Sequence, residues 1–78
     1  MNLTDRVCAT IAATLKVPQG TITATLRDED LPEWDSMGHV NLMMALEQTF
    51  DLYLEVDDFE ILKSVPAILD FLAKHEVR

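Results

Sequence analysis

Apolar residues recur along the chain at helical spacing, and the first such stretch covers residues 3–15. A spacing of three to four residues places apolar side chains on one face of a helix. Asn2 or Thr4 can cap the start of this helix, and Pro18 and Gly20 stand where it should end. The positions that repeat are Leu3, Val7, Ile11 and Leu15, with Cys8 and Ala12 beside them.

A long connection follows over residues 17–35, and it contains two prolines, one glycine and a run of acidic residues. Within it, residues 21–26 alternate threonine with apolar side chains, which is a pattern that a strand would show. No second strand is evident to pair with it, and an isolated strand is not stable. We therefore expect a packed loop, with three apolar residues as its anchors: Ile22, Leu26 and Leu31.

Three further helices are predicted after this loop. A second long helix should run from Ser36 to Phe50 with Asp35 as its N-cap, and a short element should cover residues 57–62. Ser64 should cap a fourth helix that tolerates Pro66 in its first turn, and its inner face consists of Val65, Ile68, Leu69 and Leu72. The predicted fold is all-α: one domain over residues 1–78, built as a small bundle of three longer helices and one short one.

The second helix carries two apolar arcs. An advance of about 100° per residue places Leu42, Met43, Leu46 and Phe50 on one arc, which we take as the core face. The other arc contains Met37, Val40 and Met44, next to Asn41, Glu47 and Gln48. A small bundle buries one stripe of a peripheral helix, so we expect the second arc to be partly exposed as a docking surface; the alternative is a central helix buried all round. His39 falls on the core arc, either as a hydrogen-bonded core side chain or as part of a cavity near a cofactor.

The balance of charge narrows the classes of partner. Fourteen acidic residues stand against six basic ones, which gives a net charge of −8. Such a negative field disfavours binding to nucleic acid and favours binding to partners with basic patches. A need for solubility alone would also explain the excess of acidic residues. A single cysteine, Cys8, excludes an internal disulfide and is expected to act as a small apolar side chain. No signal peptide and no membrane-spanning run is evident, so the chain is expected to be cytoplasmic.

Most catalytic and metal-binding chemistries are not supported by the motifs. Gly20 and Gly38 are the two glycines, so there is no glycine-rich phosphate loop. A calcium loop aligned from Asp28 fails because Pro32 takes a ligand position and His39 replaces the closing glutamate. A serine hydrolase would need a walled site that a chain of 78 residues does not offer. Modification of Ser36 is better supported, because a helix start accommodates a phosphodiester; alternatively, Ser36 is an ordinary first-turn residue.

The chain resembles the acyl carrier proteins over nearly its whole length. The serine motif and the second helix of that family are matched by Asp35-Ser36-Met37, Val40, Leu42, Met44-Ala45-Leu46-Glu47 and Phe50-Asp51, and the fourth helix by Ser64-Val65 and Ile68. The resemblance implies that a phosphopantetheinyl transferase attaches 4′-phosphopantetheine to Ser36, with Asp35 assisting the transferase and its metal ion. It further implies that Met37, Val40, Met44 and Glu47 meet the partner enzymes. These enzymes would load acyl, aminoacyl or ketide groups as thioesters on the 4′-phosphopantetheine arm and use them downstream. The protein would be a monomer without intrinsic catalysis.

Some residues depart from the fatty-acid carriers of bacteria. Those usually place more acids along the second helix, where this chain has Gly38, Asn41 and Gln48. Together with Trp34, this favours a specialised carrier, while a housekeeping fatty-acid carrier, a D-alanyl carrier and an unmodified helical adaptor remain as alternatives. By the resemblance, the acyl chain would be sheltered between helices near Leu46 and Ile61.

Overall fold

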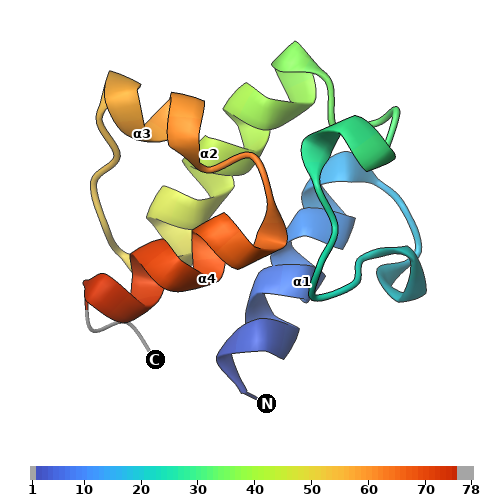
Figure 1. The fold of residues 1–78 in the computed structure, drawn as a ribbon, viewed down its shortest axis with the longest axis horizontal. Helices are drawn as coiled ribbons and strands as arrows, with labels where there is room; N and C mark the ends of the chain where they lie inside the picture. Colours follow the sequence, from blue (N-terminus) through green and yellow to red (C-terminus); the bar gives the residue numbers. More distant parts are fainter. Residues whose placement is uncertain (1, 76–78) are drawn as a thin grey trace.

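The computed structural model describes residues 2–75 and shows four α-helices joined by one long and two short connections (Figure 1). The helices are α1 (Leu3–Leu15), α2 (Ser36–Phe50), α3 (Val56–Ile61) and α4 (Val65–Lys74). The all-α prediction is confirmed, with three longer helices and one short one. The first two helices have the predicted bounds, and α3 begins one residue earlier than expected and also ends one residue earlier.

The three longer helices enclose the core. α1 packs against both α2 and α4, and the short α3 lies against α2 (Figure 1). The side chains that are almost wholly inaccessible come from these helices and from the connection before α4: Val7, Ile11, Leu42, Met43, Leu46, Leu62, Val65, Ile68 and Leu72. Leu69, also predicted on the inner face of α4, is half-buried and packs against this core. Removal of these side chains from water is the main force that holds the bundle together.

Local capping fixes where the helices begin and end. The Asn2 side chain accepts a hydrogen bond from the backbone N–H of Asp5 at 2.8 Å, so Asn2 caps α1. At its other end, α1 stops at Lys16, which adopts the left-handed conformation with φ 60°. Asp51 ends α2 in the same way with φ 52°. Pro18 follows Lys16 after one further residue, where a helix could not continue.

The long connection between α1 and α2 is a packed loop, as predicted. Its three expected anchors, Ile22, Leu26 and Leu31, are each no more than 8% exposed. In place of a strand it has two short 3₁₀ turns, Gln19–Thr21 and Asp28–Asp30, within the described residues. The residues between Ile22 and Leu26, including Ala24, are exposed, so the alternation of the sequence is not an alternation of buried and exposed side chains and needs no sheet to explain it.

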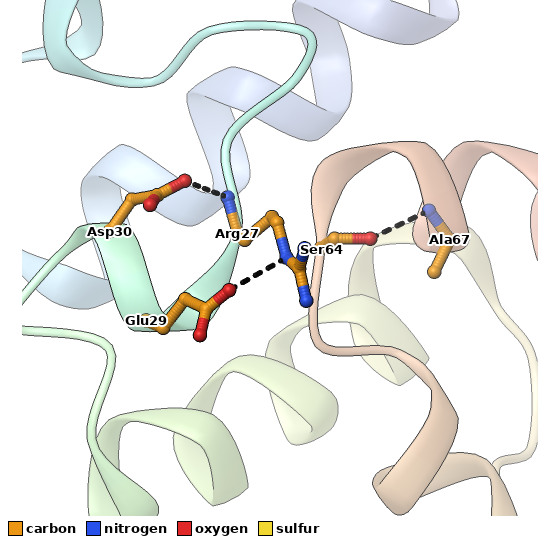
Figure 2. A network of polar contacts seen from close by, with 5 residues as sticks. All are labelled: Arg27, Glu29, Asp30, Ser64 and Ala67. Carbon is orange, nitrogen blue, oxygen red and sulfur yellow. Dashed lines mark hydrogen bonds and ion pairs between the residues drawn. The ribbon is translucent and has the colours of Figure 1, made fainter.

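One isolated antiparallel bridge ties this loop to the connection between α3 and α4. Arg27 pairs with Ser64, and on either side of them Asp28 N–H donates to Lys63 O at 2.9 Å and Val65 N–H donates to Leu26 O at 2.8 Å. Figure 2 shows Arg27 at the centre, with its guanidinium paired to Glu29 at 3.1 Å. The bridge fixes two connections that are far apart in the sequence.

Candidate functional site

The start of α2 presents an exposed serine. Asp35 caps the helix, because its Oδ1 accepts a hydrogen bond from the backbone N–H of Gly38 at 2.8 Å. Ser36 is the first helical residue, and its hydroxyl makes no hydrogen bond to any of residues 2–75. Its Oγ is therefore accessible to another molecule and is not engaged in holding the fold.

Gly38 is required by close packing around this first turn. A Cβ at Gly38 would lie 2.5 Å from the backbone oxygen of Glu33 and 3.0 Å from Leu15 Cδ2. Contacts under 3.0 Å force something to move, and the oxygen belongs to a backbone that the turn holds in place. The sequence analysis treated Gly38 only as a missing acid, whereas the structure shows that it lets the residues before Ser36 lie close over α2.

A hydrogen-bonded chain of three aromatic residues lies beneath the serine. The indole Nε1–H of Trp34 donates to Nδ1 of His39 at 3.0 Å, and Nε2 of His39 meets the backbone oxygen of Phe59. An indole N–H can only donate, so Nδ1 must accept. A neutral imidazole then carries its proton on Nε2 and donates it to Phe59 O. His39 is 9% exposed and both of its ring nitrogens are satisfied.

These residues line an open cavity of about 380 Å³ beside Ser36. Trp34, Asp35, Ser36, His39 and Val40 supply one side, and Asp28, Phe59, Glu60 and Lys63 supply the rest. The sequence analysis left two interpretations of His39 open: a hydrogen-bonded core side chain, or part of a cavity. The structure shows both features, because His39 is buried and hydrogen-bonded and also lines this cavity. Phe59 and Lys63 were not identified as site residues from the sequence, because tertiary packing brings them here, whereas Trp34 precedes the serine motif directly and was noted only as a departure from the fatty-acid carriers.

The second arc of α2 is exposed as expected. Met37, Val40 and Met44 are 75%, 46% and 49% exposed, while the core arc is buried. Glu47, the fourth residue expected to meet partners, is half-buried, and its carboxylate accepts a hydrogen bond from Leu54 N–H at 2.9 Å. One of its carboxylate oxygens is therefore engaged within the protein. The role of these four residues in binding partners stays a prediction.

The structure does not place the two residues expected to shelter an acyl chain at this cavity. Leu46 is 1% exposed in the core, Ile61 is 63% exposed on α3, and neither lines the cavity beside Ser36. Core packing explains the position of Leu46, whereas Ile61 lies near the end of a short helix that buries little of its surface.

Two comparisons with known proteins match most of the chain. The family model described as the phosphopantetheine attachment site matches residues 5–72, which is most of the chain. An acyl carrier protein from Syntrophobacter fumaroxidans is similar, with 38% identity over 66 residues that cover 85% of this chain and 82% of the relative. Within residues 2–75, no helix is long and apolar enough to cross a membrane.

Proposed function

This chain belongs to the acyl carrier protein family, and on that premise we propose that its 4′-phosphopantetheine group is attached to Ser36. One observation carries the choice of residue. The sequence has two serines, and Ser64 is engaged as the N-cap of α4, where its Oγ accepts from Ala67 N–H at 3.1 Å (Figure 2). Ser36 is exposed, and its hydroxyl has no such partner among residues 2–75.

The surroundings of Ser36 suit a phosphodiester. Backbone N–H groups of a first helical turn point outward, and the helix dipole favours negative charge there. Asp35 uses one carboxylate oxygen for the cap, which leaves the other oxygen for the transferase and its metal ion, as the family resemblance suggests. When bound, the group supplies a terminal thiol on which acyl or aminoacyl cargo is carried as a thioester. The contribution of the protein is to fix the attachment point.

We assign the carrier to a specialised biosynthetic pathway because α2 exposes more apolar than acidic surface. Its outward arc presents Met37, Val40 and Met44, and the carboxylate of Glu47 is partly occupied by Leu54 N–H. Methionine side chains adapt their shape to different partners. Partners of this carrier, namely the transferase and the loading and receiving enzymes, should therefore present apolar contacts opposite α2 in addition to basic groups.

Hydrolase chemistry at Ser36 is disfavoured by the state of His39. A general base needs an imidazole lone pair directed at the nucleophile. The lone pair of His39 sits on Nδ1 and accepts from Trp34, and the other ring nitrogen meets the backbone oxygen of Phe59. We therefore propose that the protein has no catalysis of its own.

The test is intact-mass spectrometry after incubation with coenzyme A, magnesium and a broad-specificity phosphopantetheinyl transferase. We expect one phosphopantetheinyl increment on the wild-type protein and none on Ser36→Ala. Ser64→Ala is the matched control, because it removes the other serine hydroxyl and should keep the increment. An increment that survives in Ser36→Ala would overturn the assignment. The lack of any increment on folded wild-type protein would instead favour the unmodified helical adaptor.

A further inference from the structure

We propose that Lys63 binds the phosphodiester of the group attached to Ser36, so that the cavity beside α2 is an anion site with Lys63 as its cation. This inference rests on the proposed attachment to Ser36 and assigns a ligand to a residue that the sequence analysis did not consider. Ser36 and Lys63 line the same cavity, although they are 27 positions apart in the chain.

The charges around the cavity favour a cation beside an attached phosphodiester. Three carboxylates line it, those of Asp28, Asp35 and Glu60. An added phosphodiester would bring a further negative charge among them, and the α2 dipole offsets only part of that repulsion. Lys63 is the single lysine or arginine among the described lining residues. A lysine ammonium is a compact charge that suits a phosphate oxygen.

Lys63 is available for such a contact. Its side chain is exposed and forms no ion pair with any of residues 2–75, although Asp28 and Glu60 line the same cavity. Arg27 and Lys74, by contrast, each form an ion pair with a carboxylate within four residues, Arg27 with Glu29 and Lys74 with Asp70. The ammonium of Lys63 thus lines the same cavity as the serine and is not held in an ion pair with any of residues 2–75.

The backbone of Lys63 is fixed at the edge of the cavity. Its carbonyl oxygen accepts from Asp28 N–H and its N–H donates to Ile61 O, each at 2.9 Å. The next residue, Ser64, pairs with Arg27 and caps α4 (Figure 2). The long loop therefore anchors the connection between α3 and α4, and the flexible lysine side chain starts from a defined point.

The experiment uses ³¹P NMR on the phosphopantetheinylated protein at low ionic strength. In the wild type, we expect the phosphodiester resonance to differ from that of the urea-unfolded protein carrying the same group. Lys63→Gln should shift the resonance toward the unfolded value, and Lys63→Arg should restore most of the difference. Lys74→Gln removes the same charge at the end of α4 and should leave the resonance unchanged.

Melting curves give a second measurement. Attachment of the group should lower the melting temperature of Lys63→Gln by several degrees more than that of the wild type. The difference should vanish at 1 M NaCl, where charges are screened beyond about 3 Å. Equal resonances in wild type and Lys63→Gln, or a Lys63→Arg protein that behaves like Lys63→Gln, would overturn the Lys63 contact alone. Failure of the wild type to acquire the group would overturn the attachment to Ser36 as well.

Discussion

The indole N–H of Trp34 donates to Nδ1 of His39 at 3.0 Å, and this bond joins the loop before the serine to the helix that follows it. Because His39 also contacts the backbone oxygen of Phe59, the same imidazole connects α2 to α3. Trp34 is 4% exposed and His39 9% exposed, so the intact bond is largely shielded from water. The position of the attachment site relative to α3 thus depends on one side chain with a defined tautomer.

Trp34→Phe should therefore destabilise the protein. The change keeps an aromatic ring but removes the N–H that donates to Nδ1, and an unsatisfied buried acceptor costs about 1–3 kcal/mol. For a domain of this size that corresponds to a fall in melting temperature of about 4–8 °C per kcal/mol. Trp34 is the single tryptophan, so the variant has no tryptophan fluorescence to follow. Circular dichroism is therefore the suitable measurement of the melting temperature.

Tyr53→Phe is the matched control for that experiment. It also removes one polar hydrogen-bonding group from an aromatic side chain, but Tyr53 is 78% exposed and should be neutral. Equal melting temperatures for wild type and Trp34→Phe would show that the bond contributes nothing to stability.

The two glycines should respond differently to replacement by alanine. Alanine favours a helix by about 0.5–1 kcal/mol over glycine, but at Gly38 its Cβ would meet Glu33 O at 2.5 Å. Overpacking of this kind costs about 1–3 kcal/mol, so we expect Gly38→Ala to lower the free energy of unfolding in urea. At Gly20 no atom of residues 2–75 lies within 4 Å of the added Cβ, and Gly20→Ala should be neutral or slightly stabilising. A stabilised Gly38→Ala protein would contradict the close approach of residue 33.

The parts of the fold that the sequence predicted are those set by local rules. The core arc of α2, including Leu42 and Leu46, follows from helical periodicity. The caps Asp35 and Ser64 follow from a local rule as well, because the side chain of an N-cap residue accepts from the backbone N–H three positions later. The cavity does not follow from such rules. His39 and Phe59 are 20 positions apart, and the contact exists because α3 packs against α2. No periodicity encodes that distance.

The Cys8 thiol should react slowly with alkylating reagents in the folded protein. Burial, and to a lesser extent the negative charge of Asp5, raise the pKa of Cys8 above its usual value. A raised pKa lowers the thiolate fraction at every pH below it, and the thiolate is the nucleophile. At pH 8 we expect iodoacetamide to modify Cys8 much faster in urea than in buffer. If the native and unfolded proteins react at equal rates, Cys8 is not protected. If Cys8 reacts slowly, the terminal thiol of the attached phosphopantetheine group can be labelled selectively in the folded protein.

Met44→Glu tests whether the exposed arc of α2 binds partners. Met44 is 49% exposed, so the substitution should barely change the melting temperature, while it places a charge in the apolar surface. Loss of a central contact costs more than about 1 kcal/mol, and about 1.4 kcal/mol is a tenfold change in affinity. We therefore expect the KM of the transferase, or of a receiving enzyme, to rise several-fold to tenfold.

Gln48→Glu separates charge from apolar contact in this experiment. Gln48 is exposed one turn further along α2, and the substitution adds the same negative charge without removing an apolar side chain. If partners bind the apolar arc, Gln48→Glu should leave KM unchanged or lower it through attraction to basic groups. A rise in KM of similar size for both variants would mean that added negative charge on α2 weakens partner binding, and that contact with the Met44 side chain does not explain the effect. An unchanged KM for Met44→Glu, with normal melting, would move the docking surface away from this arc.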